Sequence, residues 1–131
     1  MKSSLKKTKK TILLVDDDEQ FSSYMKEMLG DQGFNVVTAD NGDSGLTEYT
    51  YTKPDLVITD IVMPEKEGIE LILTIRETDS TTPIIAISGG NLGNADSYLN
   101  MAKKLGVNAV LAKPFSMIEI LGEIQKLLPS E

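Results

Sequence analysis

Short hydrophobic runs alternate with segments of helical spacing along this chain from residue 11 onward. The runs are rich in β-branched residues and continuous, whereas a strand with one solvent-exposed face alternates hydrophobic with polar residues. Continuous runs are typical of parallel strands that are covered on both faces. They predict strands at residues 11–16, 34–39, 55–60, 83–88 and 108–113.

Between these runs, hydrophobic residues recur every three or four positions, which predicts amphipathic helices. The predicted inward stripes are Phe21, Met25, Met28 and Leu29; Ile69, Ile72, Leu73 and Ile75–Arg76; Tyr98, Leu99, Ala102 and Leu105; and Ile120, Ile124, Leu127 and Leu128. The weakest pattern is that of 43–52, where Leu46 and Tyr49 would face inward. Strands and helices that alternate in this way predict an α/β fold, a doubly wound five-stranded parallel sheet flanked by five helices. We expect one domain over residues 10–131, preceded by a basic, disordered tail at 1–9.

Composition restricts the chemistry that this domain can perform. The chain has no cysteine and no histidine, which excludes disulfides, thiolate or imidazole metal sites and Ser-His-Asp catalysis. Five of the 13 basic residues lie in the first ten positions, so the remainder carries eight basic against 20 acidic residues. An acidic body disfavours binding to a nucleic-acid backbone. The longest purely hydrophobic runs, of which Ile12–Val15 is one, are too short to span a membrane, and we expect a cytoplasmic protein with no membrane insertion.

Polar residues stand at the ends of the predicted strands. The first, third, fourth and fifth strands end in Asp16-Asp17-Asp18-Glu19, Asp60, Ser88-Gly89-Gly90 and Lys113-Pro114, and the second ends in Thr38-Ala39-Asp40. In open α/β sheets, ligands bind outside the carboxyl ends of the strands, where the strand order reverses. In the order 2-1-3-4-5 these four strand ends converge, and the second strand lies at the edge.

The residue types at these ends suit phosphoryl transfer. Carboxylates that share one pocket repel each other and need a cation, and an all-oxygen site suits Mg²⁺. A lysine and a hydroxyl could bind phosphoryl oxygens while Asp60 acts as the nucleophile. Taken singly, each residue also has an ordinary structural interpretation: Asp16, Asp17 and Asp18 as helix caps, Asp60 and Ser88 as turn residues and Lys113 as a surface lysine.

Four segments, "ILLVDDDEQ", "DLVITDIVMPEKEG", "IIAISG" and "LAKPF", resemble the signature blocks of the response-regulator receiver domain, in the same order and spacing. The resemblance implies the flavodoxin-like fold with strand order 2-1-3-4-5 and a phosphoacceptor at Asp60. It also implies a sensor histidine kinase or phosphotransfer protein as phosphodonor, and a downstream protein target. Because the chain has no histidine, the phosphohistidine must come from the partner.

The same resemblance implies roles for the other site residues. Mg²⁺ would be held by Asp16, Asp17, Asp60 and the backbone carbonyl of Val62. Ser88 would be the switch hydroxyl and Lys113 the lysine that pairs with the phosphoryl group. The family usually has a cis peptide bond at its Lys-Pro pair, here Lys113-Pro114.

One departure from the family concerns the readout. Three residues before the lysine, the family commonly has an aromatic residue that swings inward; here the residue is Val110. Valine has few rotamers and cannot make this movement, so we expect signalling through backbone movement or a different face. The glycines within 88–98 match no nucleotide-binding motif and favour a flexible connection.

Other functions stay open at this point. In a haloacid-dehalogenase-type phosphohydrolase, Asp16 would be the nucleophile and Asp18 the acid/base. That mechanism needs a further acidic pair after the lysine and leaves Asp60 without a role. An interaction-only pseudo-receiver is a third interpretation. The chain could be a stand-alone regulator or a receiver excised from a longer protein.

Overall fold

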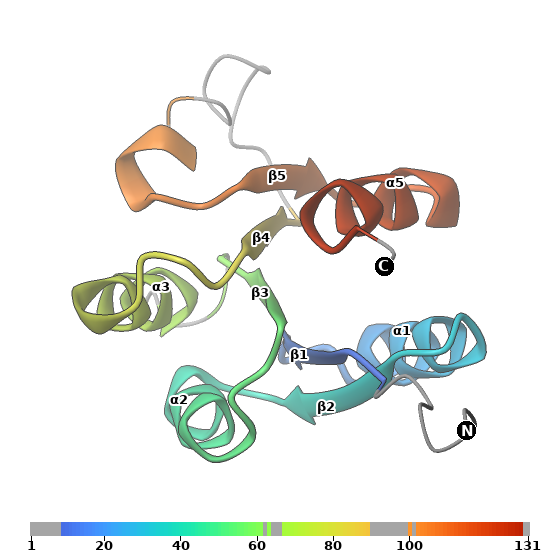
Figure 1. The fold of residues 1–131 in the computed structure, drawn as a ribbon, viewed down its shortest axis with the longest axis horizontal. Coiled ribbons are helices and arrows are strands. Elements are labelled where there is room, and N and C mark those ends of the chain that lie inside the picture. The colour runs from blue at the N-terminus through green and yellow to red at the C-terminus, as the bar shows by residue number, and fades with distance from the viewer. Residues whose placement is uncertain (1–8, 62, 64–66, 90–99, 101, 130–131) are drawn as a thin grey trace, which may run out of the picture.

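A five-stranded parallel sheet forms the centre of the molecule (Figure 1). The computed structural model describes residues 9–61, 63, 67–89, 100 and 102–129. The strands are β1 (Thr11–Val15), β2 (Asn35–Ala39), β3 (Leu56–Asp60), β4 (Ile84–Ser88) and β5 (Ala109–Ala112), in the order β2-β1-β3-β4-β5. Each strand begins and ends within one residue of its predicted bounds, and the predicted order is confirmed.

Helices cover both faces of the sheet. The helices α1 (Glu19–Asp31) and α5 (Met117–Leu127) lie on one face, and α2 (Gly42–Thr52) and α3 (Glu67–Thr78) lie on the other (Figure 1). Residues 102–105 are also helical and precede β5. Side-chain caps start three of these helices, because the carboxylate of Asp18, the amide of Asn41 and the hydroxyl of Ser116 each accept a hydrogen bond from the first turn.

Alternate strand residues point into two separate hydrophobic cores. On β1, Ile12 and Leu14 face α1 and α5, whereas Leu13 and Val15 face α2 and α3, and all four are fully buried. β3 and β4 are buried at every position. The continuous hydrophobic runs in the sequence therefore correspond to strands that are covered on both faces.

The prediction for α3 was wrong at one position. Leu73 is 47% exposed, whereas Leu71, which was left out of the predicted stripe, is 3% exposed. The buried face consists of Gly68, Leu71, Ile72 and Ile75, at spacings of three and four residues. Leu73 follows Ile72 by one residue, a rotation of about 100°, which turns its side chain toward solvent. In the third predicted stripe, Tyr98 and Leu99 lie outside the described residues.

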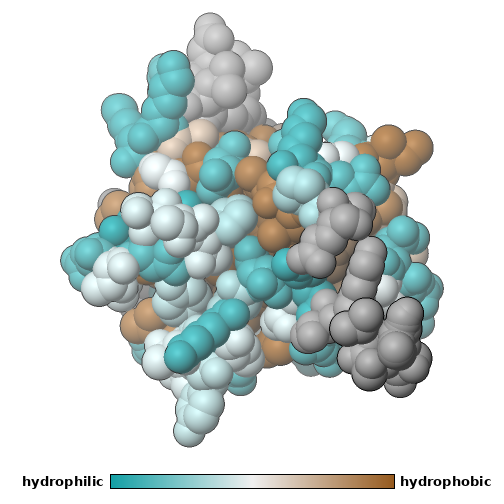
Figure 2. Space-filling view, viewed as in Figure 1, coloured by the Kyte–Doolittle hydropathy of each residue, from teal (hydrophilic) through white to brown (hydrophobic). Residues whose placement is uncertain are grey.

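The surface is mostly polar, with hydrophobic side chains in small groups on the face drawn in Figure 2. Large hydrophobic side chains that are exposed belong to Tyr24, Tyr51, Leu73 and Ile118. Within the described part of the chain, no helix is both long enough and hydrophobic enough to cross a membrane.

Candidate functional site

The residues predicted to form the site lie at the carboxyl ends of four strands. Asp16 directly follows β1, Asp60 is the last residue of β3, Ser88 is the last of β4, and Lys113 directly follows β5. Because the strands are parallel and in register, these ends meet at one edge of the sheet. The second strand ends at Ala39 on the outer edge of the sheet, as expected.

Three carboxylates gather at this edge. One oxygen atom from each of Asp16, Asp17 and Asp60 lies within 4.8 Å of the others. Asp16 and Asp60 are only 1% and 4% exposed, whereas Asp17 is exposed. Carboxylates at this separation, two of them buried, repel one another strongly unless a cation neutralises them. The cluster therefore fits an oxygen-preferring divalent ion such as Mg²⁺. Val62, the fourth predicted ligand, lies outside the described residues.

The ammonium group of Lys113 brings a positive charge to these carboxylates. Its Nζ atom lies 2.9 Å from Oδ2 of Asp16, to which it donates a hydrogen bond, and 3.6 Å from Oδ2 of Asp60. Burial lowers the pKa of Lys113, but the hydrogen bond to Asp16 and the charges of Asp16, Asp60 and Asp18 outweigh burial and raise the pKa above its ordinary value. The lysine is therefore charged at every physiological pH. The predicted cis peptide bond at Lys113-Pro114 is confirmed.

The hydroxyl of Ser88 is fully buried, and its Oγ atom has no hydrogen-bond partner among the described residues. A buried hydroxyl without a partner costs about 1–3 kcal/mol. A ligand that binds at the strand ends and accepts a hydrogen bond from this hydroxyl would offset the cost. The backbone carbonyl of Ser88 accepts a hydrogen bond from the amide of Lys113 at 2.8 Å, which links the two residues directly.

Asp16 and Asp18, in the acidic turn after β1, have different roles. Asp16 is held in place because its Oδ1 accepts a hydrogen bond from the amide of Asp18 at 2.8 Å. Asp18 caps α1, because its Oδ1 accepts a hydrogen bond from the amide of Phe21 at 3.1 Å. The capping interpretation therefore holds for Asp18, while Asp16 faces Lys113.

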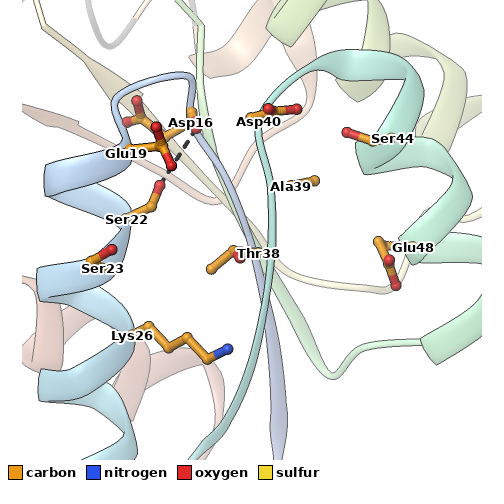
Figure 3. Close-up of a pocket in the computed structure, with 10 residues that line it drawn as sticks. All are labelled: Asp16, Glu19, Ser22, Ser23, Lys26, Thr38, Ala39, Asp40, Ser44 and Glu48. Carbon is orange, nitrogen blue, oxygen red and sulfur yellow. Dashed lines mark hydrogen bonds between the residues drawn. The ribbon is translucent and has the colours of Figure 1, made fainter.

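A cavity of about 440 Å³ opens beside the site, between α1, β2 and α2 (Figure 3). It is lined by Asp16, Glu19, Ser22, Ser23, Lys26, Thr38, Ala39, Asp40, Ser44 and Glu48. The cavity shares only Asp16 with the cluster of carboxylates, and the hydroxyl of Ser22 donates to the Asp16 carbonyl at 3.4 Å. The cavity therefore adjoins the cluster at Asp16, but Asp17, Asp60 and Lys113 are not among the residues that line it.

One contact at the site was not anticipated from the sequence. The aromatic ring of Phe21 lies beneath Lys113, whose Nζ atom is 4.1 Å from the ring centroid. Phe21 was predicted to lie on the inward stripe of its helix, because its spacing relative to Met25 is that of a core residue. No pattern in the sequence distinguishes a core aromatic residue from one that contacts a lysine about 90 residues away.

The class of protein is decided by comparison with known families. Residues 12–125 match the model of the response regulator receiver domain, and the chain belongs to this family. The resemblance noted in the sequence is thereby confirmed, and it decides against the haloacid-dehalogenase alternative. The chain is a receiver domain of the two-component type, a class that is phosphorylated by histidine kinases.

Several characterised proteins are similar to this chain. The transcriptional regulatory protein CpxR of Escherichia coli K12 is 36% identical over 117 residues, which are 89% of this chain and 48% of that protein. The PhoP regulator of alkaline phosphatase synthesis of Bacillus subtilis is 30% identical over 119 residues, 91% of this chain and 48% of that protein. The chain thus spans about half the length of these relatives. The chemotaxis response regulator CheY4 of Vibrio cholerae has a similar structure, with a TM-score of 0.82 and 27% identity over 92% of this chain and all of that chain.

Proposed function

We propose that this domain accepts a phosphoryl group on the carboxylate of Asp60 from a phosphohistidine of a sensor histidine kinase or a phosphotransfer protein. The observation that carries the proposal is the meeting of three groups at one edge of the sheet: Asp60, the ammonium of Lys113, and the buried hydroxyl of Ser88, which has no hydrogen-bond partner within the described part of the chain. A nucleophile, a cation and a hydrogen-bond donor are the groups that phosphoryl transfer requires.

In the proposed reaction, an oxygen of the Asp60 carboxylate attacks the phosphorus atom of the phosphohistidine. An O–P bond forms, the N–P bond breaks, and the electron pair of the broken bond goes to the imidazole of the partner. Asp60 suits this role because it ends a fully buried strand, so that its backbone is fixed while its carboxylate opens onto the edge. Lys113 offers its charge to the oxygens of the phosphoryl group as the N–P bond breaks.

Mg²⁺ is the cofactor that we propose for this site. Asp16, Asp17 and Asp60 would hold it, together with the backbone carbonyl of Val62 that the family pattern implies. When bound, the ion neutralises the negative charge that the phosphoryl oxygens bring to the carboxylates. Without such neutralisation, the charge of Lys113 alone would oppose three carboxylates.

The Ser88 hydroxyl would donate a hydrogen bond to an oxygen of the phosphoryl group and so report its presence. Because the carbonyl of Ser88 accepts a hydrogen bond from the amide of Lys113, a displacement of Ser88 would be transmitted to the end of β5. The resulting change of shape would be read by a downstream protein in the cytoplasm. Water would hydrolyse the adduct slowly, since valine at position 62 offers no polar group to orient it.

The test is to incubate the protein with Mg²⁺ and acetyl phosphate and to follow the adduct by mass spectrometry of the intact chain. We expect one phosphoryl group per chain, on an adduct that is stable in acid and labile in base. Asp60→Asn should abolish the adduct. Asp40→Asn is the matched control, because Asp40 directly follows the edge strand β2 but lies outside the cluster, and this variant should be phosphorylated normally.

Other outcomes would contradict the proposal. Continuous turnover of the phosphodonor that depends on Asp16, with no stable adduct, would indicate a hydrolase. An adduct that persists in Asp60→Asn would place the acceptor elsewhere. No reaction with any phosphodonor would indicate a domain that only binds partners.

A further inference from the structure

The lysine of the site has a third neighbour besides its two carboxylates. Phe21, in the first turn of α1, presents its ring to the ammonium of Lys113, with 4.1 Å between Nζ and the ring centroid. The side chain of Lys113 is 21% exposed, so water is largely excluded from the contact. A lysine ammonium within about 6 Å of a ring centroid is attracted by the partial negative charge on the face of the aromatic ring, which arises from the ring quadrupole.

We propose that Phe21 is a positioning residue for Lys113, whose ring holds the ammonium group in reach of the phosphoryl site at Asp60. The inference rests on the function proposed above for Asp60 and Lys113. It adds a residue that does not contact the phosphoryl group but determines where the lysine charge lies.

The electrostatic character of the ring explains why an aromatic residue suits this position. The two carboxylates attract the ammonium from one side, at 2.9 Å for Asp16 and 3.6 Å for Asp60. The ring of Phe21 attracts the ammonium as well, through the negative partial charge on its face, but it has no net charge and does not neutralise the ammonium. Lys113 therefore keeps its charge, and the N–H donors that are not bonded to Asp16 stay available to the phosphoryl oxygens. An aliphatic residue of similar size would fill the space without this attraction, and only the two carboxylates would then hold the flexible lysine stem.

The ring itself is held by its surroundings. The rings of Phe21 and Phe115 pack edge to face, with centroids 6.0 Å apart and planes at 90°, an arrangement that aromatic pairs prefer. The amide of Phe21 donates to the Asp18 cap, which fixes the backbone at the start of α1. Because Phe115 follows Lys113 by two residues, the aromatic pair ties α1 to the segment after β5 that bears the lysine.

Two substitutions separate the electrostatic role of the ring from its size. In Phe21→Leu the hydrophobic volume is largely kept and the ring is lost, and we expect phosphorylation by acetyl phosphate to slow by about threefold to thirtyfold. In Phe21→Tyr the ring is kept, and the rate should stay within about twofold of the wild type. Tyr24→Leu is the matched control: Tyr24 is an aromatic residue on the same helix, 55% exposed, and its rate should be that of the wild type.

A second measurement reports the contact without any reaction. In the NMR spectrum, the ε-methylene protons of Lys113 should be shifted upfield by the ring current of Phe21. The shift should persist in Phe21→Tyr and disappear in Phe21→Leu. This readout responds to the position of the lysine and not to the overall stability of the domain.

The results distinguish the failure of this inference from that of the proposed function. If the wild type forms no adduct at Asp60, the proposed function is wrong, and the NMR shift still tests the contact. If the wild type forms the adduct and Phe21→Leu reacts equally fast, Phe21 has no positioning role. A rate in Phe21→Tyr as low as in Phe21→Leu, or unshifted Lys113 protons in the wild type, would also overturn the inference.

Discussion

Replacing Gly68 by alanine should destabilise the domain, although alanine is the better helix former. Gly68 lies at the start of α3, where the helix passes over the end of β3. A Cβ atom at this position would lie 1.9 Å from the backbone carbonyl oxygen of Asp60, and 2.9 Å from both the Asp60 carbonyl carbon and the Cα atom of Ile61. All three are backbone atoms, so no side chain can rotate to relieve the overlap.

The magnitude follows from two opposing contributions. Alanine in place of glycine in a helix stabilises by about 1 kcal/mol. An ordinary carbon–oxygen contact is about 3.3 Å, so helix and strand must separate by more than about 1 Å, and overpacking on this scale costs about 1–3 kcal/mol or more. We expect a net loss of about 2 kcal/mol in the free energy of unfolding, since backbone atoms on both sides are anchored in the core. The relaxation also displaces Asp60, so phosphorylation should slow.

Urea unfolding followed by circular dichroism measures the effect. A loss of about 2 kcal/mol lowers the midpoint by about 1 M urea for a domain of this size. Gly122→Ala in α5 is the matched control, because a Cβ atom there would meet nothing within 4 Å. That control should raise the stability by about 0.5–1 kcal/mol. A Gly68→Ala variant as stable as the wild type would refute the reasoning.

Three further predictions follow from contacts in the structure. Ser88→Ala should leave the stability unchanged or raise it, because the buried hydroxyl that it removes has no hydrogen-bond partner among the residues that the structure describes. Calorimetry with the phosphoryl analogue beryllofluoride should show about tenfold weaker binding, and equal binding would contradict the switch role. Arg76→Leu should lower the free energy of unfolding, measured by urea unfolding, by about 2 kcal/mol, because the guanidinium donates hydrogen bonds to the carbonyls of Gly106, Asp79 and Thr82. Arg76→Lys should recover less than half of this loss. Tyr49→Phe should lower the free energy of unfolding by about 1–2 kcal/mol near pH 7. Burial and the hydrogen bond to Asp79 raise the pKa of Tyr49 to about 12, and hydrogen bonds from Thr82 and Tyr49 lower the pKa of Asp79. In urea titrations, the difference in free energy of unfolding between wild type and variant should therefore shrink as the pH rises from about 10 to 12, and again as it falls below about 4.

The fold was predictable because burial on both faces leaves a signal in the sequence. A strand such as β3 is hydrophobic at consecutive positions only when both of its faces are covered, and its last residue, Asp60, then stands out as polar. Parallel strands bring such residues to one edge, so the sequence alone could propose that Asp16, Asp60, Ser88 and Lys113 lie together. The prediction failed in deciding which face of α3 is buried, because three adjacent hydrophobic residues, Leu71, Ile72 and Leu73, fit the helical period in more than one way.

Side-chain contacts between distant elements were not predictable. Arg76 was assigned to an inward stripe, yet its guanidinium reaches Gly106 and Asn108, 30 and 32 residues along the chain. Phe21 contacts Lys113 across an even longer separation. Such contacts depend on rotamers and on the angle between packed elements, neither of which changes the hydrophobic pattern. The sequence therefore supplies the chemical groups of the site, but not the residues that orient them.

The position of Val110 connects these contacts to the readout. Val110 pairs with Ala86 on β4 and is half-buried against the core beneath α2 and α3. A short β-branched side chain has few rotamers and cannot swing between two positions as a long aromatic side chain can. The connection from Ser88 to the rest of the domain is instead the backbone ladder, in which the Ser88 carbonyl accepts from the Lys113 amide. Because Lys113 also contacts the ring of Phe21 on α1, a displacement of Ser88 that moves Lys113 is felt by α1 as well as by β5. The geometry therefore favours a signal carried by the end of β5 and the start of α1 over one carried by a swinging side chain at position 110.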